Sequence, residues 1–546
     1  MGAEQEQVGF IVRGSLAEGL EMKLSEARSI EQVRQGRFVV IQGVQHRFFS
    51  MVTDVALGAS SPQLLLHPPR PEEELLRQVL AGTSLYGSVQ LRPMLMLPVA
   101  DEGAADLLPV KTIPPHFSPV FDADAEDVSR VFGREGEGAH FTIGTPLEMD
   151  DTPVCLNLER FVERSNGIFG KSGTGKTFLT RICLCGIIRE RAAVCLVLDM
   201  HSEYGWAGTT EDRTRGAVRG LKQLFQGRVL VCSLDPDSSR RRGVPVEFPV
   251  RIPYSQVTVE DIALLERELN LSSTAVETGY LLVSRFGPDW LASLLGMDAQ
   301  DLKQFADESG AHHGALSALK RKLNVLQEDC QGFLKPSLPP EDDAVRRILS
   351  ALEDGKHVVL EFGQYAKPLQ YMLVANILTR RIHRAYVRRT EEAGGDRARM
   401  PRPLVIAVEE AHKFLSPGLA GQTIFGTIAR EMRKYNVTLL VVDQRPSGID
   451  PEVLSQIGTR LLCLLDDERD VDAALAGTPN AAGLRGVLAT LDSRQQALIL
   501  GHAVPMPIVV KTRVYDDEAF RRALGCLEDS ERTAEAMKGI ARDFPD

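Results

Sequence analysis

The chain has 546 residues, too many for one hydrophobic core, and its 43% hydrophobic and 25% charged residues are typical of an ordinary globular protein. No stretch approaches the ~20 consecutive apolar residues that a membrane span needs, and the N-terminus is polar and acidic, so we expect neither membrane insertion nor a secretory signal. The formal net charge of −11 argues against a surface that coats nucleic acid generally.

Eight cysteines are scattered along the chain without a Cys-x-x-Cys pair, and several, such as Cys195, lie inside predicted strands or helices. Buried reduced thiols in a cytoplasmic protein account for them without a metal or a disulfide. We therefore expect a cytoplasmic protein without a structural zinc site.

Residues 1–150 contain short β-type runs separated by glycine and polar turns, for example 8–12, 37–41 and 46–52. They show no paired carboxylates, no nucleophile constellation and no metal-ligand spacing. We expect a β domain without catalytic residues. From Leu156 onward strands and helices alternate, which predicts a parallel sheet with crossover helices.

A complete phosphate-binding loop follows the predicted strand that ends at Phe169. The loop and the start of the next helix are Gly170, Lys171, Ser172, Gly173, Thr174, Gly175, Lys176, Thr177 and Phe178. A strand, a glycine loop and a helix in this order direct backbone N–H groups and the positive end of the helix dipole at a triphosphate. Lys176 is expected to reach the β- and γ-phosphates, and the Thr177 hydroxyl to ligate Mg²⁺. The sequence therefore predicts a site for ATP and Mg²⁺.

Two further features follow before the sheet is interrupted. The strand 194–198 ends in Asp199. This acid can order the metal shell, couple the nucleotide to the subunit interface, or simply cap the loop after it. A basic run, Arg240, Arg241 and Arg242, lies beside a glycine between a strand end and the next apolar segment. It is our candidate for a DNA-contacting loop, and a solvated surface loop is an equally good interpretation.

Residues 257–345 have the apolar periodicity of amphipathic helices and predict an inserted helical bundle. The ATPase core is accordingly expected at 151–256 and 346–511. Residues 512–546 are charged and predict a helical tail that packs on a neighbour or stays mobile.

A buried strand at 403–408 ends in Glu409 and Glu410. Carboxylates at the C-terminal end of a parallel strand face the ligand crevice of an open α/β sheet. One can complete the Mg²⁺ shell while the other polarises a water for in-line attack. We assign Glu409 to the metal and Glu410 to the general base. The alternative is that both acids merely favour the N-terminus of a helix.

A third strand, 437–442, is followed by Asp443 and Gln444. Gln444 can sense the γ-phosphate and hold the attacking water, or it can simply belong to a turn. The helix before this strand carries Arg430 and Arg433 near its end. They are either cations favoured by the helix dipole or an arginine finger that acts across a subunit interface.

Together these motifs resemble the HerA family of hexameric DNA translocases, within the FtsK–HerA group of P-loop NTPases. The resemblance rests on GKSGTGKT, DMHSEY, VIAVEEAHKFL, IAREMRKYNVTL and VDQRPS, and covers about 161–511. The chain departs from the usual pattern at Met200, Ser202 and Asp443, where the family commonly has Pro, Gly and Ser.

The resemblance implies an α/β fold: a RecA-like core with a small N-terminal β-barrel and the inserted bundle. It also implies trans-acting basic residues, for which Arg164, before the phosphate loop, and Arg430 or Arg433 are the candidates. A homohexamer whose central channel alone is basic is compatible with the negative net charge.

The expected function is an ATP-driven translocase of double-stranded DNA that works with a NurA-type nuclease in end processing and repair. The alternative is an ATPase ring that scaffolds an effector protein in an anti-phage defence complex. A protein-export or conjugation ATPase of the same superfamily is a third option, which the β-rich N-terminal segment disfavours.

Overall fold

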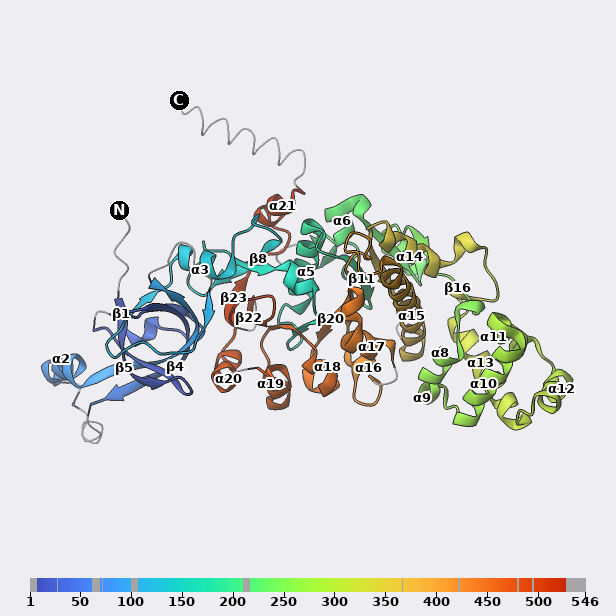
Figure 1. Cartoon of the computed structure of the whole chain (residues 1–546), viewed down its shortest axis with the longest axis horizontal. Helices are drawn as coiled ribbons and strands as arrows, with labels where there is room; N and C mark the ends of the chain where they lie inside the picture. Colours follow the sequence, from blue (N-terminus) through green and yellow to red (C-terminus); the bar gives the residue numbers. More distant parts are fainter. Residues whose placement is uncertain are drawn as a thin grey trace, which may run out of the picture.

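The computed structural model describes residues 7–26, 28–60, 69–70, 72–99, 107–209, 217–365, 367–420, 423–478, 481–492 and 495–526. Three parts lie in a row: a β domain, a central sheet covered by helices, and a helical bundle (Figure 1). Among the described residues, no helix combines the length and the apolar character that crossing a membrane requires.

The N-terminal part is a closed barrel, as expected. Its strands are β1 (Gln7–Ser15), β2 (Gly19–Leu24), β3 (Phe38–Gln42), β4 (His46–Ala59), β5 (Leu85–Pro98) and β7 (Pro119–Asp122), with β6 (Leu108–Pro109) added to β5. They pair in the order β2-β1-β7-β3-β4-β5, and β2 pairs with β5 to close the ring. Phe48, Val52 and Leu91 are among its buried side chains, so the alternating pattern of these strands fills the interior.

The central sheet has twelve described strands. The parallel ones, in spatial order, are β15 (Phe248–Pro249), β14 (Val229–Ser233), β18 (His357–Glu361), β11 (Val194–Asp199), β19 (Leu404–Glu409), β20 (Val437–Asp443), β10 (Asn166–Phe169) and β21 (Thr459–Leu462). Antiparallel strands β22 (Gln496–Gly501), β23 (Ile508–Thr512), β8 (His140–Pro146) and β9 (Val154–Asn157) complete it. The nearly continuous apolar sequences of the parallel strands β11, β19 and β20 fit a sheet that is buried on both faces.

The chain enters this sheet earlier than the sequence suggests. β8 begins at His140 and pairs with β23 and β9, so residues 140–146 belong to the central sheet and not to the barrel. The sequence of β8 does not show which sheet the strand joins, because Phe141 and Ile143 alternate with polar residues as they would in a barrel strand. At the other end β23 continues to Thr512, and α21 (Glu518–Leu524) packs on the core with Phe520 fully buried.

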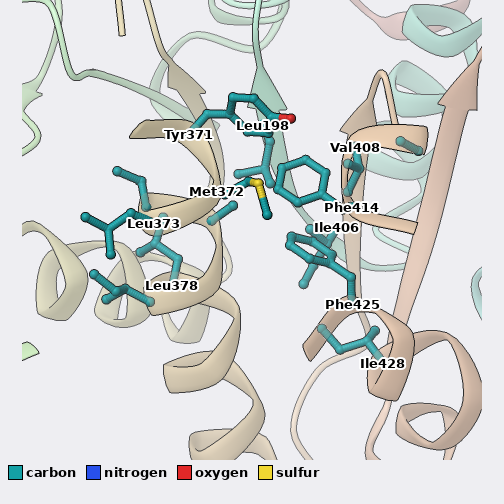
Figure 2. Close-up of a cluster of buried hydrophobic side chains, with 14 of the residues drawn as sticks. Leu198, Tyr371, Met372, Leu373, Leu378, Ile406, Val408, Phe414, Phe425 and Ile428 are labelled. Carbon is teal, nitrogen blue, oxygen red and sulfur yellow. The ribbon is translucent and has the colours of Figure 1, made fainter. Parts of the chain in front are cut away.

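Helices cover the sheet on both sides. α15 (Pro368–Ala393) lies against β11 and β19, where Tyr371 and Met372 meet Leu198, Ile406 and Val408 (Figure 2). Phe414 and Phe425 extend this cluster, with ring centroids 4.7 Å apart. Truncating one such buried ring to alanine typically costs ~3–5 kcal/mol, so this layer fixes the position of the neighbouring strand ends.

The bundle contains α8 (Val259–Leu264), α9 (Glu266–Leu269), α10 (Ser273–Phe286), α11 (Trp290–Gly296), α12 (Ala299–Ser309) and α13 (His313–Cys330). Thr258 and Asp298 cap α8 and α12 with capping boxes, which explains where these helices begin. α14 (Ala344–Glu353) then returns the chain to β18.

Candidate nucleotide site

The phosphate-binding loop joins β10 to α5 (Lys176–Glu190). Gly175 has φ +92°, a left-handed conformation that glycine adopts without a Cβ clash. A Cβ at Gly170 would lie 2.6 Å from the Cβ of Cys463 on the neighbouring segment, so that position also requires glycine. The first N–H groups of α5 have no partner within the helix, so they are free to donate hydrogen bonds to an anion bound at the loop.

The loop is held in place by contacts of its own and by contacts with the segment after β21. The Thr174 hydroxyl donates to the carbonyl of Lys171 at 2.7 Å, and Lys176 Nζ donates to the same carbonyl at 2.8 Å. The backbone N–H of Lys171 donates to the carbonyl of Leu464 at 3.0 Å, and its side chain is ion-paired with Asp466. Lys176 therefore already lies within the loop where a triphosphate would bind.

Four adjacent strands each end in a buried acid. Glu361 ends β18, Asp199 ends β11, Glu409 ends β19 and Asp443 ends β20, and all four are at most 8% exposed. Because the strands are parallel, these carboxyl groups share one edge of the sheet with the loop after β10. This edge is the topological position where open α/β sheets bind ligands.

Glu409 and Glu410 point to different neighbours. The Tyr204 hydroxyl donates to Glu409 Oε1 at 2.7 Å, whereas Gln444 Nε2 donates to Glu410 Oε1 at 3.2 Å. Glu410 has φ +49°, unusual for a non-glycine residue, and the chain turns there directly after the strand. Strain of this kind, roughly 1–3 kcal/mol, is found preferentially at functional positions.

The surroundings of Glu409 match a cation site. Burial and the nearby Asp199 charge raise the pKa of Glu409 to about 8. Its Oε2 atom is buried and has no hydrogen-bond partner among the described residues. A divalent cation at this open position would favour the anionic form of the carboxyl, and a carboxylate oxygen without another partner is what a hard divalent cation binds. Glu409, with Thr177 on α5, therefore fits Mg²⁺.

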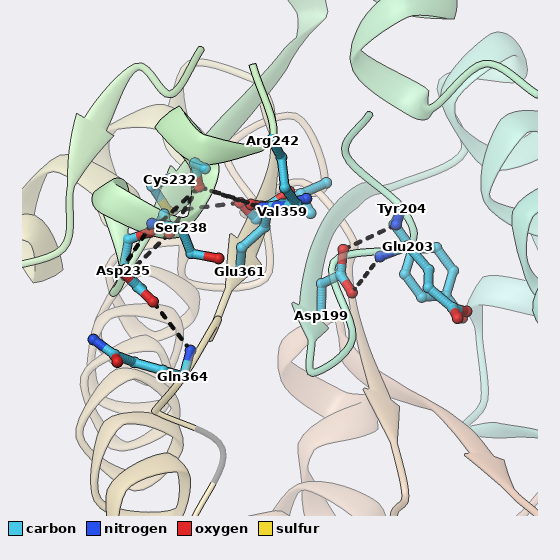
Figure 3. A network of polar contacts seen from close by, with 12 residues as sticks. Asp199, Glu203, Tyr204, Cys232, Asp235, Ser238, Arg242, Val359, Glu361 and Gln364 are labelled. Carbon is cyan, nitrogen blue, oxygen red and sulfur yellow. Dashed lines mark hydrogen bonds and ion pairs between the residues drawn. The ribbon is translucent and has the colours of Figure 1, made fainter. Parts of the chain in front are cut away.

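Asp199 has a different task. Its two carboxylate oxygens accept the backbone N–H groups of Glu203 at 3.0 Å and Tyr204 at 2.9 Å (Figure 3). Burial raises the pKa of Asp199 to about 6. Of the interpretations given above, these contacts match the loop cap.

Asp443 and His412 tie β20 to the segment after β19. Asp443 accepts the backbone N–H and the ring Nδ1 of His412, at 2.7 and 2.9 Å, and the backbone N–H of Arg445 at 2.8 Å. This carboxylate raises the pKa of His412. The sequence alone did not single out His412.

The candidate trans-acting arginines differ in how free they are. Arg433, in η7 (Met432–Tyr435), is exposed and makes no side-chain hydrogen bond or ion pair with other described residues. Arg430, at the end of α17 (Ile424–Glu431), lies 3.6 Å from Glu452 and is half-buried. Arg164 is half-buried and packs against Gly458.

The basic run at 240–242 is not the open loop that the sequence predicts. Arg240 and Arg241 end the helix α7 (Pro236–Arg241), and Arg242 is its C-cap. This helix begins where it does because the Asp235 side chain accepts the Ser238 N–H and Pro236 occupies the first turn. Arg242 is ion-paired with the fully buried Glu361 (Figure 3). Arg240 lies 2.8 Å from Asp237. Arg240 and Arg241 are exposed, whereas the Arg242 guanidinium is held by Glu361, so the first two are the part of this run that is available to a ligand.

The chain matches the family described as the central domain of helicase HerA over residues 141–382. It is 25% identical to the DNA double-strand break repair helicase HerA of Pyrococcus furiosus, over 74% of each chain. It is 28% identical to the protein of that name from Sulfurisphaera tokodaii, over 97% of this chain and 98% of that one. A probable DNA double-strand break repair helicase HerA of Methanocaldococcus jannaschii is 30% identical over 68% of this chain and 76% of its own. The chain belongs to the HerA helicase family. It is a P-loop ATPase with a RecA-like core, as the parallel sheet and the phosphate-binding loop described above also indicate.

Proposed function

We propose that this HerA-family ATPase binds ATP with Mg²⁺ at the loop 170–177 and hydrolyses it with Glu410 as the general base. The observation that carries this proposal is the pairing of Glu410 with Gln444 at 3.2 Å on the sheet edge that also holds the loop. Lys176 would bind the β- and γ-phosphates, and the backbone N–H groups of 170–176 would orient them.

In the reaction, Glu410 would take the proton of the attacking water while Gln444 holds that water in line with the γ-phosphate. Thr177 and Glu409 would hold the Mg²⁺, which when bound neutralises charge on the β- and γ-phosphate oxygens. Phe178 follows Thr177 on α5, and its ring lies 5.9 Å from that of Tyr515. It would help to shape the site beside the phosphates.

The test is Glu410→Gln, which removes the base and keeps the size of the side chain. We expect ATP to bind as to the wild type while turnover falls ~10²–10⁴-fold, because only proton transfer is lost. Lys176→Ala should instead abolish binding, and Glu392→Gln, an exposed helix residue, should change neither. Fluorescent nucleotide titration and phosphate release measure both. If Glu410→Gln hydrolysed ATP at the wild-type rate, Glu410 would not be the general base and Glu409 would be the next candidate.

We further propose that hydrolysis drives double-stranded DNA through a homohexameric ring. The names of the relatives as double-strand break repair helicases support DNA as the substrate. Arg240 and Arg241 on α7 are the proposed DNA contacts, acting on phosphates and not on bases, which predicts sequence-independent binding that salt weakens.

The proposed partner is a NurA-type nuclease, which the ring would feed with DNA in the cytoplasm. The repair function in the names of the relatives favours this partner over an effector protein of a defence complex. A nuclease gene beside the gene for this chain would support the repair role, and an effector gene there would favour defence.

A further inference from the structure

A buried chain of contacts connects the helix after the phosphate loop to Glu409. It starts at Arg181 on α5, which is only 3% exposed. Its guanidinium lies over the rings of Phe178 at 5.4 Å, Tyr204 at 6.0 Å and Tyr515 at 5.4 Å from the ring centroids. It also donates a hydrogen bond to the carbonyl of Glu203. Stacking of a guanidinium on aromatic faces is favourable, and more so when water is excluded.

The segment after β11 receives this support from the other side. Asp199 accepts the N–H groups of both Glu203 and Tyr204 (Figure 3). Ser202 takes φ +56° to make the turn. Tyr204 is fully buried. It is therefore fixed at its backbone by Asp199 and at its ring by Arg181, and its hydroxyl donates to Glu409 Oε1 at 2.7 Å.

This geometry leaves the two oxygens of Glu409 unequal. Oε1 is occupied by the Tyr204 hydroxyl, and Oε2 is buried without a partner among the described residues. Partners that hold a ligand carboxylate in this way set which oxygen faces the metal.

We propose that Tyr204 is a positioning residue that holds Glu409 in the orientation for binding the divalent cation, and that Arg181 couples this position to the phosphate-loop helix. The inference rests on the proposed function, in which Glu409 and Thr177 hold Mg²⁺. Arg181 and Thr177 both lie on α5. The helix that carries the metal ligand Thr177 therefore also holds the segment 199–204, whose Tyr204 orients the second ligand, Glu409.

The experiment is Tyr204→Phe, which removes the hydroxyl and keeps the ring under Arg181. Mn²⁺ replaces Mg²⁺, and its binding to the protein with ADP is followed by electron paramagnetic resonance, while nucleotide affinity in EDTA is measured separately. We expect the Mn²⁺ concentration for half-saturation to rise ~10-fold or more, as loss of such partners costs ~10–100-fold in metal affinity. Affinity for nucleotide in EDTA should stay within about twofold, because the loop itself is untouched.

The matched control is Tyr386→Phe. Tyr386 is another buried tyrosine, but it lies beside Pro401, ahead of β19 and so at the opposite end of that strand. The Tyr386→Phe variant should therefore bind Mn²⁺ as the wild type does. Wild-type protein that binds no nucleotide would refute the proposed function itself. A wild-type Mn²⁺ response in Tyr204→Phe, with nucleotide still bound, would refute only the role of Tyr204.

A second comparison distinguishes a loss of Mn²⁺ binding that acts through Glu409 from a loss caused by poor folding of Tyr204→Phe. Glu409→Gln and Glu409→Gln/Tyr204→Phe should bind Mn²⁺ equally weakly, because Tyr204 acts only through Glu409. A further loss of Mn²⁺ affinity in the double variant would overturn the proposal.

Discussion

Asp443 stands where HerA-like chains often have serine, and its surroundings show how a buried carboxylate is accommodated there. Three donors reach it: two from His412 and one from Arg445. A buried carboxylate is tolerated when hydrogen bonds replace its hydration. Asp443 and His412 thus form a pair that links the strand end carrying Gln444 to the segment carrying Glu410.

This pair predicts a pH dependence of stability. The hydrogen bond with Asp443 raises the pKa of His412 above 6.5, so folding favours the protonated ring. Its contribution is fully present below about pH 6.5 and disappears as the pH rises through the folded-state pKa. The melting temperature should therefore fall more for His412→Asn at pH 6 than at pH 8.5. His116→Asn, at an exposed position in the first part of the chain, serves as the control. An equal difference at both pH values would contradict the prediction.

At the scale of elements, the strands and their acidic ends are predictable because a parallel sheet places every carboxyl end on one edge. That reasoning located Glu409, Glu410 and Gln444 correctly at strand ends. The same reasoning did not identify Tyr204. Its contact with Glu409 joins residues 205 positions apart in the sequence and depends on how the segment 199–204 folds. The reasoning also missed α7, although Asp235 before Pro236 is a recognisable helix start.

α7 yields a prediction that separates structure from DNA contact. Arg242→Ala should destabilise the protein by ~1–3 kcal/mol, because it leaves the buried Glu361 without its charged partner. The double variant Arg242→Ala/Glu361→Gln should recover part of this loss. Arg240→Ala/Arg241→Ala should cost less than ~0.5 kcal/mol, as exposed positions do, and should lower the stimulation of ATPase by DNA. Urea unfolding and ATPase assays measure these effects. If Arg242→Ala were as stable as the wild type, the predicted structural role of Arg242 would be wrong.

For the whole molecule, the composition of the site suggests that a single subunit is incomplete. The side chains of Glu409, Glu410 and Gln444 make hydrogen bonds or ion pairs with Tyr204, His412 or each other, and with no arginine in the described part of the chain. In P-loop NTPases an arginine supplied in cis or in trans stabilises the charge of the transition state, in addition to the loop lysine and the metal. Arg433 is exposed and unpaired among the described residues, which makes it the better candidate than Arg430 for reaching a neighbouring subunit.

Mixing subunits tests this arrangement. Arg433→Ala and Lys176→Ala rings should each be inactive, the first for want of the finger and the second for want of the loop lysine. In a ring assembled at random from equal amounts, about a quarter of the interfaces combine an intact loop with an intact finger from the neighbour. Phosphate release should therefore recover in the mixture. A mixture of Lys176→Ala with Glu410→Gln should stay inactive, because the base and the loop lysine belong to the same subunit and no interface then holds both. Recovery with both pairs would mean that Glu410 also acts across the interface. Recovery with neither, in rings shown to be intact by light scattering, would place Arg433 in the site of its own chain.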